Sequence, residues 1–205
     1  MFDFGLSQSS KFLEPDEVRA IIESVSKVSR YSVRDIRFFE LLWQSGARVS
    51  EALSLLPGKI GTTSVVLPNL KQYKRVKTNG KTVRVRDYKA TKEIEVSEEL
   101  CLQLKSFCKD NHIKEDQFVF QPNREGKGHL CRSYVWWILG KASLAAGVRP
   151  IFGKKHPKTG GRFKGAFPHM LRHSNAMYLL EQTGDISIVK EQLGHALIRT
   201  TQGYA

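Results

Sequence analysis

The chain has 205 residues, enough for one large domain or two small ones with a real core. Lys and Arg number 33 against 20 Asp and Glu, a formal net charge of +13 that favours a polyanionic partner, nucleic acid before an acidic membrane. No run of about 18 apolar residues and no basic-then-apolar N-terminus is present, so neither a membrane span nor a signal peptide is predicted. Three cysteines without a C-x-x-C pair are typical of free thiols in a reducing compartment, not of a disulfide or metal site.

The first half of the chain begins with helical signals. Residues 1–14 resemble a leader or linker, and Pro15 then opens a helix with an apolar stripe of residues spaced three and four apart. A second helix is expected over residues 32–44 and is ended by Gly46. Arg48 stands at the start of a short third helix, where outward-facing backbone N–H groups could join its guanidinium in binding an anion.

From Gly61 onward the apolar period changes to two. Alternating or β-branched segments near residues 63–67, 82–86 and 93–96, with a turn signal at Asn79-Gly80, predict three antiparallel strands. Helices are expected again from Ser97 to about Lys109 and over residues 132–146. The prediction is therefore a mainly α protein with a small three-stranded antiparallel sheet, in the α+β class.

Trp136 and Trp137 are adjacent in the last of these helices. Neighbouring positions on a helix cannot both face the core, so one tryptophan is expected at its edge. Core packing is favoured there over stacking on a base.

The positive charge is concentrated in two segments, residues 71–89 and 149–164. Either cluster alone could be ordinary solvated surface. Because the two clusters flank a group of phosphate-suited residues, we expect them to contact a DNA backbone. The residues predicted to bind DNA are Lys74, Arg75, Lys77, Lys89, Lys154, Lys155, Lys158 and Arg162.

The last third of the chain carries four polar groups that suit one ligand. His169 and Arg172 are three residues apart on a predicted helix and therefore lie on the same face. His195 and Tyr204 follow after another helical segment. A guanidinium fork, two imidazoles and a phenol cannot build a carboxylate or hard-metal site, but they suit a phosphate and supply an oxygen nucleophile.

These residues fall within motifs of a known family. H-x-L-R-H at residues 169–173, L-G-H at 193–195 and T-T-x-x-Y at 200–204 resemble the C-terminal signature of tyrosine recombinases, the phage-integrase and Xer-like site-specific DNA recombinases. Residues 46–53, G-A-R-V-S-E-A-L, resemble the family's first-arginine motif, G-x-R-x-S-E-x-L. The resemblance extends from about Pro15 to Tyr204.

The resemblance implies a catalytic domain over residues 15–205 that cleaves and rejoins DNA through a 3′-phosphotyrosine. Tyr204 would attack phosphorus, Arg48 and Arg172 would neutralise the transition state, and His195 would donate a further hydrogen bond. His169 would take the tyrosine proton. No metal or other cofactor is implied. The partner would be double-stranded DNA, bound by a homotetramer on paired sites that is monomeric when free, in a cytoplasmic, DNA-associated setting.

The family also uses a lysine of the small sheet to protonate the departing 5′ oxygen. Lys71 follows Arg48 by 23 residues, the family's usual interval, whereas Lys89 lies in a more similar local sequence but 41 residues after Arg48. A hairpin lengthened by about 15 residues creates this ambiguity, and the spacing favours Lys71.

Two departures from the family pattern leave alternatives open. There is no room for the usual N-terminal DNA-clamping domain, and the C-terminal exchange helix is missing, so either a fragment or a minimal recombinase is expected. Competing functions are a type IB topoisomerase and a non-catalytic DNA-binding module of the same fold.

Overall fold

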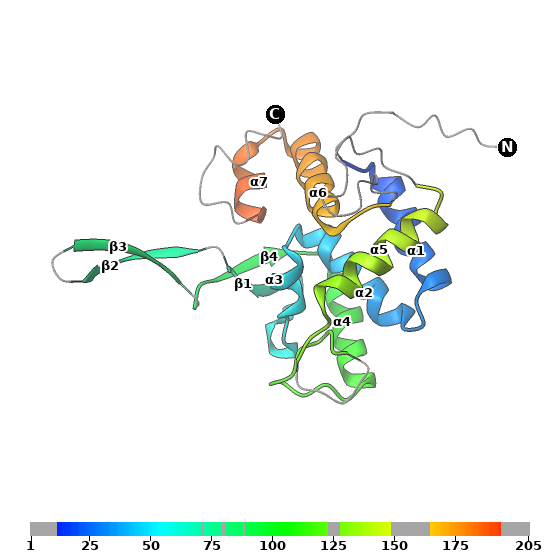
Figure 1. The fold of residues 1–205 in the computed structure, drawn as a ribbon, viewed down its shortest axis with the longest axis horizontal. Coiled ribbons are helices and arrows are strands. Elements are labelled where there is room, and N and C mark those ends of the chain that lie inside the picture. Colours follow the sequence, from blue (N-terminus) through cyan, green and yellow to red (C-terminus); the bar gives the residue numbers. More distant parts are fainter. Residues whose placement is uncertain are drawn as a thin grey trace.

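The structure, a computed structural model, describes residues 12–70, 72–78, 81–87, 89–122, 128–148 and 165–193, and only the backbone of Lys81, Arg84 and Arg86. Within these ranges the chain is mainly helical, with two short antiparallel sheets (Figure 1). The predicted fold class is confirmed.

The helices are arranged around α2 (Ser32–Ser45), which packs against α1 (Pro15–Val28) and α6 (Pro168–Thr183), while α1 also packs against α5 (Arg132–Ala145). Their apolar faces meet in one core, in which the edge-to-face rings of Phe38 and Phe120 lie 4.9 Å apart. Leu13, just before α1, is buried in this core, and its N–H donates to Ser174 Oγ (2.7 Å).

Two adjacent tryptophans in α5 both reach the surface. Trp136 is 38% exposed and stacks on Phe167 at 5.2 Å, and Trp137 is 52% exposed beneath the Lys141 ammonium. Both side chains are thus exposed, and the expectation that one of the two tryptophans packs in the core is wrong.

The first sheet pairs β1 (Ser64–Pro68) with β4 (Thr91–Glu95). Its inward face consists of Val65, Leu67 and Ile94, which are fully or almost fully buried. The helix α4 (Glu98–Asp110) follows at once, capped by Ser97, whose Oγ accepts the N–H of Leu100 (3.2 Å). Packing of α4 against β1 and α2 joins this sheet to the helical core.

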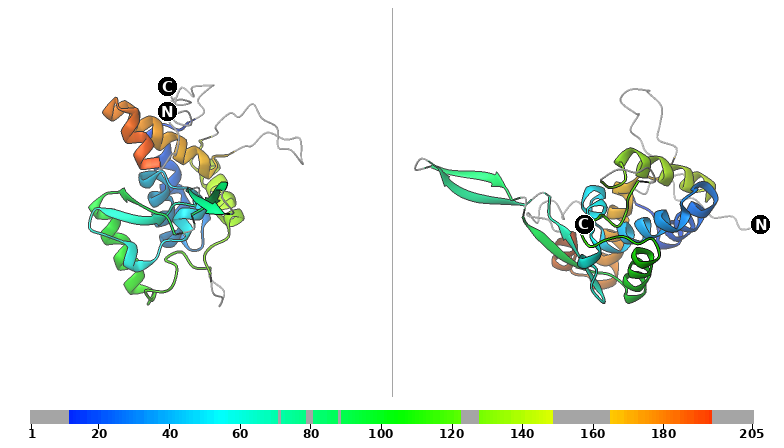
Figure 2. Two further views of the ribbon diagram at one scale, coloured as in Figure 1. Left: turned by 90° about the vertical axis from the view of Figure 1, so that its left-hand side faces the viewer. Right: turned by 90° about the horizontal axis from the view of Figure 1, so that it is seen from below.

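A second sheet, which we call the ribbon, is the hairpin of β2 (Tyr73–Thr78) and β3 (Lys81–Arg86). It projects away from the body in every view (Figures 1 and 2). The described part of the chain thus has four strands in two separate pairs, where one sheet of three strands was expected. β2 was missed because half of its residues are basic and none is buried, so no apolar alternation marks it as a strand.

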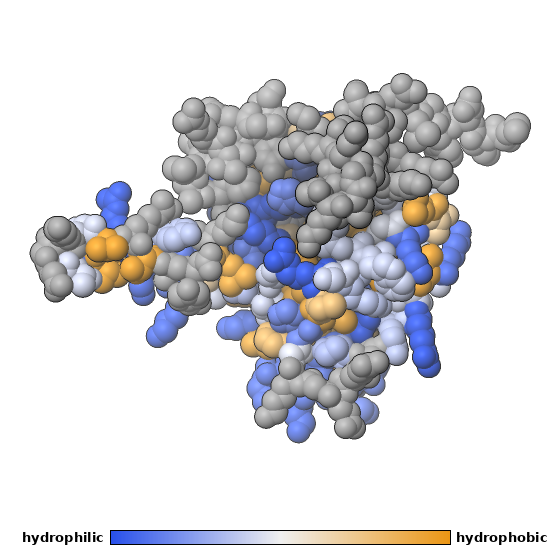
Figure 3. Space-filling model, in the orientation of Figure 1, coloured by the Kyte–Doolittle hydropathy of each residue, from blue (hydrophilic) through white to orange (hydrophobic). Residues whose placement is uncertain are grey.

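The register of the ribbon gives it two different faces. Directly paired residues share a face, and successive residues alternate. Val76 pairs with Val83 and Lys74 with Val85 on one face, whereas Arg75 and Lys77 belong to the other. Apolar and hydrophilic side chains accordingly mix along the projecting arm in Figure 3.

Two further helices, α3 (Val49–Leu53) and α7 (Ile186–Leu193), lie near the C-terminal end of α2. A short 3-10 helix (Pro57–Lys59) leads from α3 toward β1. In the ranges that the structure describes, no helix is long and apolar enough to cross a membrane.

Candidate active site

Arg48 stands at the N-cap of α3 and is held by Glu51, three residues later. The Arg48 guanidinium donates to Glu51 Oε1 (2.8 Å), and the Arg48 backbone N–H donates to Glu51 Oε2 (3.1 Å). Glu51 is fully buried, whereas the Arg48 side chain remains 23% exposed. The carboxylate therefore fixes both the backbone and the side chain of an arginine that still reaches the surface.

Lys92 approaches the same carboxylate from the sheet. Its register partner is Leu67, so the side chain lies on the inward face of β4 with Ile94. Lys92 Nζ is 3.1 Å from Glu51 Oε2, and the side chain is only 9% exposed. This contact is an ion pair, because in the described part of the chain Lys92 Nζ has no well-aligned hydrogen-bond partner.

The surroundings change the acidity of both groups. Burial alone would raise the pKa of Glu51, but the charges of Lys92 and Arg48 and the hydrogen bonds from Arg48 outweigh it and lower that pKa. For Lys92, burial is the largest effect, and together with the charges of Arg172 and Arg48 it lowers the pKa to about 8, against the opposing attraction of Glu51. Lys92 is thus a cation at neutral pH that loses its proton only slightly above it.

Arg172 comes to this cluster from the first half of α6. It is 2% exposed, and its guanidinium donates to the backbone carbonyls of Gly46 and of Leu193 (2.8 Å for the latter). Gly46 ends α2 two residues before Arg48, and Leu193 ends α7 two residues before His195. Arg172 therefore ties together the two segments that carry other predicted site residues.

A left-handed glycine makes this junction possible. Gly46 has φ +56°, and a Cβ there would lie 2.5 Å from Asn175 Oδ1 and 2.7 Å from Leu193 Cδ2. Gln192 adds a second tie, because its side-chain amide donates to the carbonyls of Gln44 (3.1 Å) and Glu95 (3.2 Å). The ends of α2, α7 and β4 are thus held against one another.

The structure brings Arg48 and Arg172 into one cluster, since both act on Lys92, and it places His169 in the first turn of α6, exposed and three residues before Arg172. Three predicted catalytic residues, Lys71, His195 and Tyr204, lie outside the described residues. Their roles stay predictions.

Among the predicted DNA-binding residues, Lys74, Arg75 and Lys77 are exposed on β2 of the ribbon. Lys89 is also exposed, beside Asp87, whose Oδ1 accepts the Lys89 backbone N–H (3.2 Å). Asp87 also lies 3.7 Å from Lys74 Nζ, a distant and open ion pair. The second predicted group, Lys154, Lys155, Lys158 and Arg162, falls outside the described ranges.

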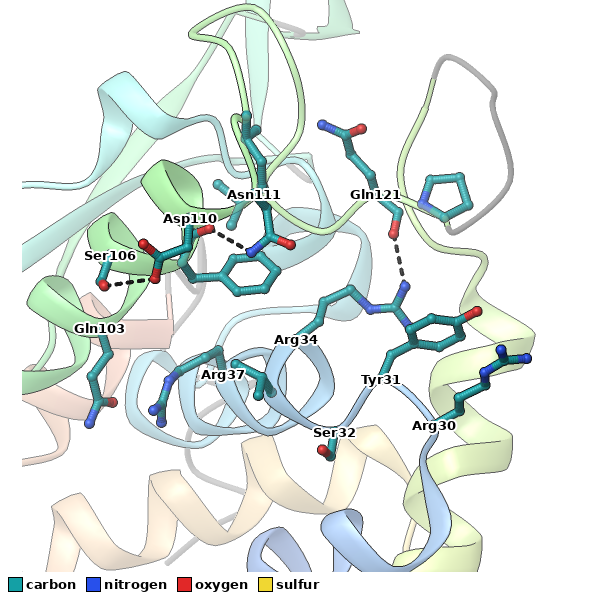
Figure 4. Close-up of a pocket in the computed structure, with 15 residues that line it drawn as sticks. Arg30, Tyr31, Ser32, Arg34, Arg37, Gln103, Ser106, Asp110, Asn111 and Gln121 are labelled. Carbon is teal, nitrogen blue, oxygen red and sulfur yellow. Dashed lines mark hydrogen bonds between the residues drawn. The ribbon is translucent and has the colours of Figure 1, made fainter.

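A cavity of about 660 Å³ lies elsewhere, between the start of α2 and the end of α4 (Figure 4). Its most buried cation, Arg34, donates to the Gln121 carbonyl (3.0 Å) and pairs with Asp35 (2.8 Å). Asp35 in turn accepts from Ser29 and Tyr134, so this network joins α1, α2 and α5. We interpret it as structural. No group of three potential metal ligands was found among the residues described.

Lys92 is the site residue that the sequence predictions missed. The signal for it is present: positions 92, 94 and 96 alternate toward the core, and the last two are Ile94 and Val96. A lysine at an inward position is costly to bury unless it is paired. This pattern marks Lys92 for a role beyond surface charge.

Comparison with known proteins agrees with this geometry. The profile of the phage integrase family matches residues 11–205. Tyrosine recombinase XerD of Oceanobacillus iheyensis is 31% identical over 94% of this chain and 56% of its own length, and tyrosine recombinase XerA of Thermococcus onnurineus is 30% identical over 95% and 57%. The chain thus spans a little over half the length of these relatives.

Solved structures share the fold. A XerA recombinase matches with a TM-score of 0.68 at 22% identity, over 94% of this chain and 59% of that one. XerH bound to its difH substrate matches with 0.66 at 20% identity, over 96% and 50%. The catalytic domain of bacteriophage HP1 integrase matches with 0.56 at 21% identity, over 94% and 85%. With the family profile spanning nearly the whole chain, the protein belongs to the phage integrase family of tyrosine recombinases.

Proposed function

We propose that this chain is the catalytic domain of a site-specific DNA recombinase that cleaves and rejoins DNA through a 3′-phosphotyrosine. The observation that carries the proposal is a cluster in which Arg48 and Lys92 both contact the carboxylate of Glu51, with Arg172 close enough to Lys92 to lower its pKa. Three cations and one anion leave a formal charge of +2, which suits a phosphodiester that gains negative charge on the way to its transition state. Membership of the integrase family supports the same reaction.

In the proposed reaction the Tyr204 oxygen attacks the scissile phosphorus. A bond forms between that oxygen and phosphorus while the bond from phosphorus to the 5′ oxygen breaks. His169 accepts the tyrosine proton, and Lys71 gives a proton to the departing 5′ oxygen. Arg48, Arg172 and His195 bind the non-bridging oxygens. Because the phosphotyrosine keeps the ester bond, attack by another 5′ hydroxyl reverses the step and joins a new strand.

The proposed substrate is double-stranded DNA, which a homotetramer binds on paired sites, and the protein is a monomer when it is free of DNA. Lys74, Arg75, Lys77 and Lys89 would contact backbone phosphates from the ribbon and its base, and Lys154, Lys155, Lys158 and Arg162 would do so from the second basic segment. Among the solved relatives, XerH is bound to its difH substrate, which supports a DNA partner for this fold. We place the protein on DNA in the cytoplasm.

The decisive experiment uses a nicked suicide substrate that traps the covalent intermediate. The wild-type chain should give a protein–DNA adduct that survives denaturation, and Tyr204→Phe should give none while binding DNA within a few-fold of wild type. Tyr178→Phe is the matched control, because Tyr178 is a 38%-exposed tyrosine on α6 with no proposed role, and it should form the adduct normally.

Other outcomes would point elsewhere. DNA binding without any wild-type adduct would indicate a non-catalytic binding module and overturn the proposal. An adduct accompanied by relaxation of plain supercoiled plasmid, with no preference for a site, would indicate a topoisomerase.

A further inference from the structure

We propose that Lys92 is a positioning residue for strand cleavage. Through Glu51 it keeps Arg48 directed at the scissile phosphate, and it balances the charge of Glu51 so that the positive charge of Arg48 is not cancelled. The inference rests on the proposed function and deepens it.

The position of Lys92 argues against a role in stability. It faces inward from β4 opposite Leu67, at a place where an apolar residue would extend the face formed by Val65 and Ile94. Replacing a buried ion pair by packed apolar residues is often neutral or stabilising. A lysine here is therefore explained better by what its charge does than by what it adds to the fold.

Its charge acts on Glu51. The two carboxylate oxygens are divided: Oε1 accepts from the Arg48 guanidinium (2.8 Å), while Oε2 lies 3.1 Å from Lys92 Nζ and accepts the Arg48 backbone N–H. Lys92 thus holds one oxygen while the other orients Arg48. Without Lys92, the buried carboxylate would have only Arg48 as a close cation among the residues that the structure describes, and that pair would be nearly neutral toward the DNA.

Lys92 and Arg48 differ in how far they are exposed, and this difference indicates different roles. The Lys92 ammonium nitrogen is buried, whereas Arg48 keeps a quarter of its side chain at the surface. Arg48 is therefore the group that can contact a phosphate, and Lys92 acts on it indirectly, through Glu51. The charged groups around Lys92 are Glu51 and Arg48 at α3 and Arg172 from α6, and its strand partner Leu67 is apolar.

The first test compares Lys92→Met with Lys92→Arg in single-turnover cleavage of the suicide substrate. Removing a group that orients a metal ligand typically lowers activity about 10–100-fold, and Lys92 would orient Arg48 in a comparable way. We expect a loss of that size for Lys92→Met, and a rate within about fivefold of wild type for Lys92→Arg, which keeps the charge. Equal rates for wild type and Lys92→Met would overturn the proposal.

The second test separates positioning from proton donation. A substrate with sulfur in place of the 5′ bridging oxygen leaves without a proton, so it should largely restore Lys71→Ala, the proposed general-acid variant, but not Lys92→Met. Restoration of Lys92→Met by sulfur would make Lys92 the proton donor and overturn the positioning role. Restoration of Lys89→Ala but not of Lys71→Ala would move the general-acid assignment to Lys89.

The third test is a pH profile on the sulfur substrate, measured with protein far below saturation so that the rate reports the free protein. Lys92 is charged below its folded pKa of about 8 and neutral above it. The ratio of the wild-type rate to the Lys92→Arg rate should therefore fall as pH rises through about 8, since arginine stays charged. A ratio that is constant from pH 7 to pH 9.5 would contradict the proposal.

The fourth test is a double-mutant cycle, which asks whether Lys92 acts on cleavage through Glu51. Lys92→Met, Glu51→Gln and the double variant should show losses in cleavage that do not add, because both residues act through Arg48. Additive losses would contradict action through Glu51. The double variant also removes both buried charges, so it keeps the test usable if Lys92→Met folds poorly. Absence of an adduct in the wild type would refute the proposed function itself, a different result from any outcome for Lys92.

Discussion

At the scale of single residues, two ion pairs in this chain have the same spacing and different surroundings. Arg48–Glu51 and Arg37–Glu40 are both i, i+3 pairs with nitrogen-to-oxygen distances of 2.8 and 2.7 Å. Glu51 is fully buried, but Glu40 is 26% exposed. The Arg37–Glu40 pair is partly exposed, and attraction between charges in contact with water is weak and screened. Glu51 is buried, and it is also the counter-ion of the buried Lys92. The pairs are therefore a matched test of what burial contributes.

We predict that Glu51→Gln lowers the free energy of unfolding by about 3 kcal/mol, because it leaves Lys92 buried without its counter-ion. Glu40→Gln, the control, should cost under about 1 kcal/mol. Urea denaturation at pH 7 measures both. Similar small losses for the two variants would show that the Glu51 cluster is not held by charge.

The same variant has a pH dependence of known sign. The pKa of Glu51 is lower in the folded chain than its ordinary value of 4.5. Its ionised form therefore stabilises the fold fully above pH 4.5, and this contribution is lost as pH falls through the lower folded pKa. The difference in stability between wild type and Glu51→Gln should accordingly shrink below about pH 4.5.

At the scale of helices and strands, two glycines end helices in the left-handed conformation but differ in what surrounds them. Gly46 ends α2 with φ +56°, and Gly184 ends α6 with φ +65°. A Cβ on Gly184 would meet nothing within 4 Å, whereas one on Gly46 would clash with Asn175 and Leu193. The Gly46 carbonyl also accepts from Arg172.

Gly184→Ala should therefore cost only the left-handed strain, about 1–2 kcal/mol, and leave cleavage unchanged. Gly46→Ala should cost more stability and slow cleavage as well, because the clash moves the ends of α2 and α7 that Arg172 joins. Thermal unfolding and the suicide-substrate assay, run on both variants, measure these effects. Equal behaviour of the two variants would mean that close packing at Gly46 is unimportant.

Much of the helical architecture could be predicted from the sequence, because helix ends carry local chemical signals. Pro15 at the start of α1, Gly46 after α2 and Ser97 before α4 all lie where the structure ends or begins those helices. β2 could not be found in this way. Its residues are exposed on both faces, so burial imposes no alternation on the sequence.

The candidate site was predicted unevenly for a related reason. Arg48 and Arg172 lie in motifs that identify them without any knowledge of the fold, and the structure brings them into one cluster. Lys92 is the second lysine of residues 88–93, which resemble the family's G-K-x-x-K-x turn, but that resemblance alone gives it no role. Its place beside Glu51 depends on the pairing of β4 with β1, which turns it toward this carboxylate. Charge alone could not distinguish it from the exposed lysines of the ribbon.

At the scale of the whole molecule, the ribbon separates part of the basic charge from the catalytic cluster. It joins β1 to β4, so it continues from the end of the sheet that carries Lys92, and its strands project away from the helical body (Figure 1). An isolated two-stranded hairpin is marginally stable in water. Binding along a DNA backbone would give its exposed lysines and arginine a counter-charge and hold the ribbon in place.

We predict that replacing Lys74, Arg75 and Lys77 together by Gln weakens DNA binding and reduces its salt dependence. Each lost phosphate contact lowers the slope of log K against log salt by roughly 0.9, so three lost contacts would lower it by about 2.7. Titrations at several salt concentrations, on specific and unrelated DNA, measure the slope. The loss should be similar for both sequences, because phosphate contacts carry little sequence information.

Replacing Lys105, Lys109 and Lys114 by Gln is the control that separates an effect of the ribbon from an effect of the overall charge. These lysines are also exposed, on α4 and the turn after it, and the control changes the net charge by the same amount. If the ribbon contacts DNA, the slope should fall in the ribbon variant and stay near the wild-type value in the control. Equal reductions in both would show that overall charge attracts the DNA, and an unchanged slope in the ribbon variant would leave its basic residues as solvated surface.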